Sequence, residues 1–336
     1  MQDYICSSFT KFFKNDSLGF LSRHRLFPDD LKIEFLPFPG ENSWVKHVTD
    51  LTKMSLYLSE VFLDIVEYLR IAGVDVIALK GPVLAFALFE DVGKRYFGDL
   101  DFLVSDEDLT KVISVLANHG FRQSYPKAEL TEKQKKYYFK WKKDIGLVNG
   151  GKRIFLELHT GIYYHELVTL EKEHLFFEDT IEETLAGTDV RCMNRDNTFL
   201  YLTFHGSLHM YCRLFWLRDV AEALKRWELN HAKILNNAYE LGIERLLGLS
   251  LELSRDFFGA EIPREYKNLL EENASTINML KNFCVKRILG PEELSLMGKI
   301  RKHYYMMSLK PGIKYKYIAF ISIFHRWYIR KFMGGN

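Results

Sequence analysis

Two aspartates separated by a single residue, Asp99 and Asp101, lie in the apolar stretch of residues 97–104. If this stretch forms a β-strand, residues two apart project from the same face, so both carboxylates point to one side. Two unpaired carboxylates repel each other and cost free energy when buried, whereas a divalent cation between them would relieve the repulsion. Mg²⁺ favours such oxygen ligands and adds water and substrate phosphates. The spacing therefore indicates a metal site, and the alternative is a solvated pair of carboxylates on an edge strand.

Three further features point to phosphate chemistry near this pair. Glu157 stands within the apolar segment IFLEL, where an acidic residue is otherwise out of place. Lys80 and Gly81 directly precede Pro82, which suits the first turn of a helix, and the N–H groups of a helix N-terminus can bind phosphate. Arg95 lies just before the aspartates, where its guanidinium could reach phosphate oxygens. The simpler alternatives are a solvated Lys80 at a strand end and a surface ion pair for Arg95.

The hydrophobic pattern predicts the elements that would carry these residues. Apolar residues at helical spacing over 48–71, followed by Gly73, favour a helix, and the β-branched run 74–79 favours a strand. Asn149-Gly150 separates two strand-like segments and suits the positive φ angles of a type I′ turn. The expected elements are, in order, a helix over 48–71, a strand over 74–79, a helix from Pro82 to near Gly93, a strand over 97–104, a helix over 105–118 and the hairpin strands 142–148 and 152–159.

The pattern changes after Thr160, where the sequence indicates an acidic helical stretch, a short strand around Val190 and long helical segments over 197–270. The expected fold class is therefore α/β, a mixed sheet with flanking helices followed by an α-helical domain. The expected parts are an N-terminal extension over 1–47, an α/β domain over 48–160, an α-helical domain over 161–290 and a basic, aromatic C-terminal segment over 291–336.

The order of these motifs resembles the DNA polymerase beta nucleotidyltransferase superfamily. More narrowly, LKGPVLAFALF followed by GKRYFGDLDFLV, HGF and LELH is similar to an uncharacterised bacterial nucleotidyltransferase family of that superfamily. The match covers residues 48–160 well and the helical part to about Pro263 more loosely. The chain departs from the wider superfamily in having Lys80-Gly81 where a Gly-Ser or Gly-Gly pair is usual, and Glu157 where the third carboxylate is commonly Asp.

The resemblance implies a polymerase-beta-like fold and the transfer of an NMP group from an NTP to a hydroxyl, with Mg²⁺ or Mn²⁺ as cofactor and ATP as the default donor. Asp99 and Asp101 would ligate two metals that bridge the nucleotide phosphates. Glu157 would complete the metal site and could accept the proton of the acceptor hydroxyl. Gly81 and neighbouring amides would cradle the phosphate tail, where Lys80 and Arg95 could also bind.

A small molecule is the favoured acceptor of the nucleotidyl group. One alternative is a protein or a tRNA, as for some superfamily members in toxin–antitoxin pairs. The lack of a clear basic groove speaks against tRNA. The other alternative is a catalytically silent nucleotide-binding module, which would have little reason to keep all three carboxylates.

Two other regions have open roles. His205 and His209 share a helix face and could bind zinc, but no third ligand is evident, so packed histidines are favoured; the role of the nearby Asp219 is also open. The segment 299–331 is rich in Lys, Arg, Tyr and Phe and could contact an anionic membrane surface or a charged acceptor. A solvated surface helix with snorkelling side chains is the alternative.

Bulk properties narrow the class of protein. With 336 residues, 47% of them hydrophobic and 27% charged, the chain has a globular composition and room for two domains. A net charge of +2 gives no reason to expect a DNA-binding protein. The four cysteines form no CxxC pair, and neither a signal peptide nor a span of about 20 apolar residues is found. We expect a cytoplasmic enzyme whose partners are a nucleotide and a small-molecule acceptor.

Overall fold

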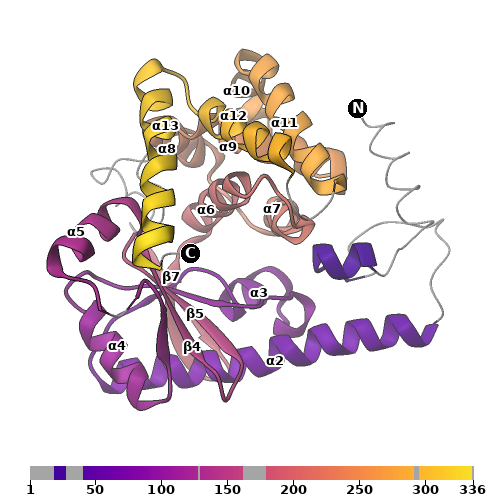
Figure 1. The fold of residues 1–336 in the computed structure, drawn as a ribbon. Coiled ribbons are helices and arrows are strands. Elements are labelled where there is room, and N and C mark those ends of the chain that lie inside the picture. Colours follow the sequence, from indigo (N-terminus) through magenta and orange to yellow (C-terminus); the bar gives the residue numbers. More distant parts are fainter. Residues whose placement is uncertain (1–18, 28–40, 128, 162–178, 291–294, 335–336) are drawn as a thin grey trace. The chain divides into compact units, whose positions relative to one another are not determined.

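The computed structural model describes residues 19–27, 41–127, 129–161, 179–290 and 295–334. The chain divides into two compact units. The sheet unit comprises Thr52–Asn194 and Tyr317–Asn336, and the helical unit comprises Met1–Leu51 and Arg195–Lys316. Each unit therefore combines segments that lie far apart in the chain. Two helices, α2 (Glu41–Ile71) and α13 (Ile313–Tyr328), contribute to both units (Figure 1).

The sheet unit is built on a seven-stranded mixed sheet with the strand order β3-β4-β5-β2-β1-β7-β6. β2 runs parallel to β5 and β1 runs parallel to β7, whereas the other neighbouring strands are antiparallel. The strands are β1 (Ile77–Ala78), β2 (Leu100–Leu103), β3 (Arg122–Tyr125), β4 (Asp144–Asn149), β5 (Ile154–His159), β6 (Thr180–Leu185) and β7 (Thr188–Met193). Strand β2, which contains Asp101 and directly follows Asp99, thus lies in the middle of the sheet.

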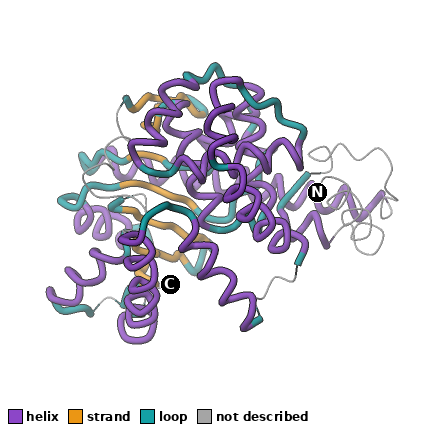
Figure 2. Tube along the Cα trace, turned by 90° about the horizontal axis from the view of Figure 1, so that it is seen from above, coloured by secondary structure: helices purple, strands orange, loops and turns teal. Residues whose placement is uncertain are grey.

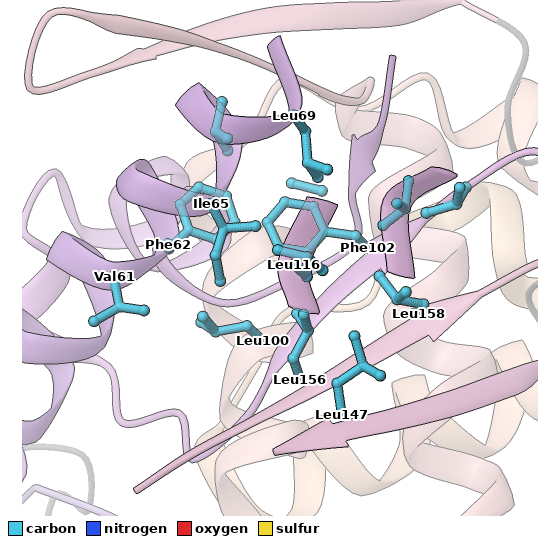
Figure 3. Packing of buried hydrophobic residues seen from close by; sticks show 14 of the residues in the cluster. Val61, Phe62, Ile65, Leu69, Leu100, Phe102, Leu116, Leu147, Leu156 and Leu158 are labelled. Carbon is cyan, nitrogen blue, oxygen red and sulfur yellow. The ribbon is translucent and has the colours of Figure 1, made fainter. Parts of the chain in front are cut away.

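An apolar core joins the sheet to helices α2 and α4 (Leu109–Asn118). On α2 the fully buried residues Phe62, Ile65 and Leu69 recur at the spacing of one helix face. The Phe62 ring stacks on Phe102 of β2 with 5.0 Å between ring centroids. Figure 3 shows leucines of β2, β4, β5 and α4 in the same cluster. Because this core takes alternate residues of β2 and β5, the residues between them project from the opposite face.

Among the described residues, the remaining helices are all shorter than α2. The sheet unit also contains α3 (Pro82–Phe89), η2 (Val92–Lys94), α5 (Glu132–Trp141) and a π-helical turn, η5 (Ile329–Met333). The helical unit contains α6 (Arg195–Leu208), α7 (Leu214–Arg226), α8 (His231–Leu241), α9 (Glu244–Phe258), η4 (Arg264–Tyr266), α10 (Lys267–Glu272), α11 (Ala274–Leu289) and α12 (Leu296–Ser308). Within it, α9 packs against α6, α7 and α11. Figure 2 distinguishes helices from strands along the chain.

The expected fold class is confirmed: a mixed sheet with flanking helices is followed in the chain by helices α6 to α12. The strands predicted over 74–79 and 97–104 are shorter in the structure, because only β1 and β2 within them have pairing partners. The short strand around Val190 is confirmed as β7. Strands β3 and β6 and helix α5 were not predicted. The predicted four-part division of the chain at 47, 160 and 290 stays a prediction.

The hairpin of β4 and β5 is confirmed, but its predicted type I′ turn is wrong. Asn149 still pairs with Ile154, so four residues form the loop, and the positive φ angle (54°) falls on Arg153. The Asn149 side chain accepts a 3.1 Å hydrogen bond from the backbone N–H of Lys152. This side-chain bond closes a wider turn than the tight one that Asn-Gly suggested.

Two other predictions concern the segment after Thr160 and the presence of a membrane-spanning helix. The acidic helix predicted after Thr160 falls largely on residues 162–178, which lie outside the described residues. Within the ranges that the structure describes, every helix is too short or too polar to cross a bilayer.

Candidate active site

A single row of residues crosses four adjacent strands of the sheet. Tyr125 of β3 lies opposite Gly146 of β4, which lies opposite Glu157 of β5. Glu157 in turn lies opposite Asp101 of the parallel strand β2. Residues opposite one another on neighbouring strands project from the same face. The row therefore gathers two carboxylates and a phenol on the face that points away from the apolar core.

His159 forms a compact group with Asp101 and Glu157. It lies two residues after Glu157 on β5 and so shares its face. Each of the three residues offers one atom that could bind a metal, and these three atoms lie within 4.8 Å of one another. His159 Nε2 is 3.1 Å from Asp101 Oδ1 and 3.6 Å from Glu157 Oε2. Since Asp101 is only 2% exposed, such contacts replace the water that would otherwise solvate its charge.

Lys80 contacts the second carboxylate oxygen of Asp101. Its Nζ lies 3.2 Å from Asp101 Oδ2. The strand pairing explains this position, because the backbone N–H of Leu79 donates a 3.1 Å hydrogen bond to the Asp101 carbonyl, which keeps the end of β1 beside β2. The Lys80 side chain is 10% exposed. The alternative of a solvated strand-end lysine is therefore wrong.

The electrostatics of the group disfavour the ionised form of Glu157. Burial, followed by the charge of Asp101, raises the pKa of Glu157, although His159 and a hydrogen bond from Tyr125 oppose this shift. For His159, burial acts to lower the pKa, but the hydrogen bond and charge of Asp101 and the charge of Glu157 raise it overall. Two neighbouring acids that resist joint ionisation would gain from a bound cation.

The chemistry of the donor set fits a divalent cation. Carboxylate oxygens are the ligands that Mg²⁺ and Mn²⁺ prefer, and Asp101 and Glu157 bring two carboxylates together. Imidazole is more typical of softer ions, so beside Mg²⁺ the role that suits His159 is to orient the Asp101 carboxylate by its hydrogen bond.

Tyr125 fixes the other end of the row. Its hydroxyl donates a 2.6 Å hydrogen bond to Glu157 Oε1. The ring reaches Glu157 across β4 because Gly146 has no side chain: a Cβ there would lie 2.2 Å from Tyr125 Cε1. Burial, together with the charges of Asp144 and Glu157, raises the pKa of Tyr125, so the phenol keeps its proton. Tyr125 is therefore a permanent donor that orients one oxygen of Glu157.

The remaining predicted site residues are not members of the group formed by Asp101, Glu157 and His159. Asp99 stands one residue before β2, is partly exposed and lies outside the group of three. Gly81 is the N-cap of α3, with a φ of 70° that favours glycine, and its carbonyl accepts a 3.0 Å hydrogen bond from the N–H of Ala85. Arg95 is 2% exposed, and its carbonyl accepts a 3.0 Å hydrogen bond from the Ser55 hydroxyl. Arg95 is thus not the surface residue that the ion-pair alternative described.

Sequence reasoning missed His159 and Tyr125. The alternation of β5 could have indicated His159, since it follows Glu157 by two residues in the motif LELH. No comparable signal existed for Tyr125, because its place beside Glu157 depends on the register of β3 on β4, which includes an irregularity between Gln123 and Tyr125.

His205 and His209 pack among aromatic rings. Their ring centroids are 4.8 Å apart, and they lie 5.4 Å and 4.9 Å from the Trp216 ring. Among the described residues they belong to no group of three side chains that could hold a metal. These contacts agree with the packed histidines favoured from the sequence. Asp219 is fully buried on α7.

Clustered carboxylates on a mixed sheet are the arrangement expected of a nucleotidyltransferase. The family model described as "Uncharacterised nucleotidyltransferase" matches residues 30–259, and this chain belongs to that family. No curated protein matches the chain. Among solved structures, the crystal structure of ANT(2")-Ia in complex with adenylyl-2"-tobramycin is similar with a TM-score of 0.35 and 12% sequence identity, over 54% of this chain and 95% of that one. The family assignment supports nucleotidyl transfer as the general activity.

Proposed function

We propose that this protein transfers an NMP group from an NTP, with ATP as the default donor, to a hydroxyl of a small molecule, and that the reaction depends on Mg²⁺ or Mn²⁺ and releases pyrophosphate. The observation that carries the proposal is the convergence of Asp101, Glu157 and His159 within 4.8 Å in a chain of a nucleotidyltransferase family. A group of two acids and a histidine, placed by strand register, is more than a core needs for packing.

Asp101 and Glu157 would hold the metal, with Asp99, one residue before β2, as a further ligand. A bound divalent cation supplies charge that polarises the α-phosphate and lowers the pKa of the acceptor hydroxyl. His159 holds Asp101 in place, and Tyr125 holds Glu157. Both are positioning residues in this proposal.

Glu157 also suits the role of proton acceptor. A carboxylate within reach of the acceptor hydroxyl can accept its proton directly or through a water. The hydrogen bond from Tyr125 engages Oε1, so Oε2, which lies 3.6 Å from His159 Nε2, is the oxygen that would accept the proton directly or through a water. The proton would thus move from the acceptor hydroxyl to Glu157 Oε2 as the hydroxyl attacks the α-phosphate.

The phosphate tail would bind at Lys80 and at the N-terminus of α3 beside Gly81. The first turn of α3 contains no acidic residue, so its N–H groups and helix dipole favour an anion. Lys80 already lies at the Asp101 carboxylate and could pair with phosphate oxygens when a cation takes its place. The predicted contact from Arg95 would require its buried guanidinium to be uncovered.

The test combines NTP binding with label transfer. Isothermal titration should show NTP binding that requires Mg²⁺ or Mn²⁺, and Asp101→Asn should abolish it. The exposed Asp106 provides a matched control, because Asp106→Asn changes the same charge just beyond β2.

The transfer experiment incubates the protein with labelled NTP and a cell extract, and the label should pass to a small-molecule fraction. Label in protein or tRNA would favour the alternative acceptors, and metal-dependent binding without any transfer would favour a silent module. Absence of metal-dependent NTP binding would remove the basis of the proposal.

A further inference from the structure

Helix α13 and the turn η5 are held to the sheet unit by one side. Ser322, Ile329 and Met333 are at most 1% exposed. The Met333 carbonyl accepts a 2.8 Å hydrogen bond from the backbone N–H of Lys127, and the His325 ring stacks on Trp141 of α5 with 3.7 Å between centroids. This inner side therefore accounts for the attachment of the helix, and its stability does not require the opposite side to be apolar.

The opposite side is nevertheless lined with aromatic rings, which we call the aromatic ridge. Its members recur every three to five residues and are about half or more exposed: Tyr317 65%, Phe320 50%, Phe324 59%, Trp327 57% and Phe332 49%. Two pairs of these rings contact each other, with 5.5 Å between the centroids of Phe320 and Phe324 and 6.1 Å between those of Trp327 and Phe332. Single exposed apolar residues are common, but five exposed rings on one side of a helix mark an interaction surface.

The segment that carries the aromatic ridge has basic residues and no acidic ones. Residues 313–336, which begin with α13, contain five Lys and Arg residues and no Asp or Glu, whereas the rest of the chain has 46 − 5 = 41 basic and 44 acidic residues. Exposed basic residues flank the ridge at Lys316, Arg330 and Lys331. Lys331 Nζ lies 5.0 Å from the Trp327 ring centroid and 5.4 Å from that of Phe332. The positive charge is thus concentrated where the aromatic rings are exposed.

We infer that the aromatic ridge docks this protein on an anionic lipid surface. Phe and Trp side chains at the crest of a helix can enter the boundary between headgroups and acyl chains, while flanking Lys and Arg side chains reach the lipid phosphates. A second copy of the chain is a poorer occupant, because pairing the same surface would bring two positive segments together. A nucleic acid is poorer as well, because the rings stand on a convex helix rather than in a basic groove. The helix lies on the membrane and does not cross it.

Vesicle binding by the full chain tests the inference. The protein should co-sediment with vesicles of phosphatidylcholine that contain 30% phosphatidylserine, and only weakly with phosphatidylcholine alone. Phe320→Ser/Phe324→Ser should weaken binding by at least about 10-fold, since burying the exposed half of each ring contributes about 0.75 kcal/mol or more. Arg330→Gln/Lys331→Gln should weaken it by about 25-fold, from about 1 kcal/mol per charge. Tyr239→Ser/Lys267→Gln, at exposed positions of α8 and α10, is the control and should bind normally.

A second readout locates the helix in the bilayer. Brominated lipids should quench Trp327 fluorescence, and Trp327→Phe should remove most of that quenching. The ridge variants should unfold at the wild-type temperature, because the substituted side chains are exposed. Equal binding to both vesicle types, or unchanged binding by the phenylalanine variant, would overturn the inference. Two other occupants of the aromatic ridge would also overturn it: a second copy, shown by a wild-type dimer that the phenylalanine variant dissociates, or a nucleic acid, shown by oligonucleotide binding in place of vesicle binding. If the wild type fails to bind vesicles and the ridge variants unfold at a lower temperature, another part of the chain covers the aromatic ridge and the inference is wrong.

Discussion

The substitution Gly146→Ala would disturb Glu157 while leaving every charged group of the site in the chain. A Cβ at this position would lie 2.2 Å from Tyr125 Cε1 and 2.5 Å from Cδ1, whereas ordinary contacts begin at about 3.4 Å. The Tyr125 ring would have to move by about 3.4 − 2.2 = 1.2 Å. A shift of that size along the 2.6 Å hydrogen bond would lengthen it to about 3.8 Å and break it. Glu157 would then lose the donor that orients it.

The expected cost has two parts. Overpacking of this kind costs about 1–3 kcal/mol, and loss of a hydrogen bond to a charged group costs about 1.5–3 kcal/mol. The free energy of unfolding should therefore fall by about 2.5–6 kcal/mol. If Tyr125 orients Glu157 for the reaction, the second part also appears as roughly a 10- to 100-fold loss of kcat/KM.

A double-mutant cycle separates these effects. In a Tyr125→Ala background the ring is gone, and the nearest remaining atom, Ser124 Oγ at 2.8 Å, can rotate away, so Gly146→Ala should cost less than about 1 kcal/mol. Tyr125→Phe keeps the ring and removes only the hydroxyl, so it should share the loss of kcat/KM without the overpacking cost. Urea denaturation and pyrophosphate release measure the two quantities. An equal cost of Gly146→Ala in both backgrounds, or full activity of Tyr125→Phe, would refute the reasoning.

Three further predictions follow from buried groups. Lys80→Met should lower the free energy of unfolding by up to about 3 kcal/mol, because the buried Asp101 carboxylate would lose the ammonium that lies 3.2 Å from it. Mg²⁺ should stabilise this variant more than the wild type in thermal unfolding. Burial, with the charges of nearby arginines, lowers the pKa of His24 to about 3. Because the unfolded state takes up the proton first, stability should fall as the pH drops from about 6.5 towards 3, by about 2 kcal/mol at pH 5. In urea titrations at pH 7.5 and 5, His24→Asn should remove most of this loss of stability. If the variant loses as much stability between the two pH values as the wild type, His24 is not its cause. Phe62→Ala should cost about 3–5 kcal/mol as a core cavity in the same assay, and a cost below 1 kcal/mol would contradict the packing.

Local pattern was sufficient to predict the strands that carry Asp101 and Glu157. Apolar spacing indicated the helix that became α2, and the glycines at the hairpin placed β4 and β5 on either side of a turn. Asp101 and Glu157 stood out because an acidic residue within an apolar strand is costly without a partner. Strand β3 was missed because RQSY has little apolar alternation, and its pairing with β4 comes from the sheet and not from its own residues.

The sequence by itself determined which side chains share a face of a strand, because alternation along β2 and β5 is a local property of the backbone. Only the tertiary structure decided that these faces meet: the parallel register of β2 on β5 places Asp101 opposite Glu157, and a slip by one residue would turn one of them to the other face. That register is set by the apolar residues that alternate with the acids along each strand, such as Phe102, which pack against helices from other parts of the chain. The same long-range packing brings Lys80 and Tyr125 to the two acids, and no local pattern contains that information.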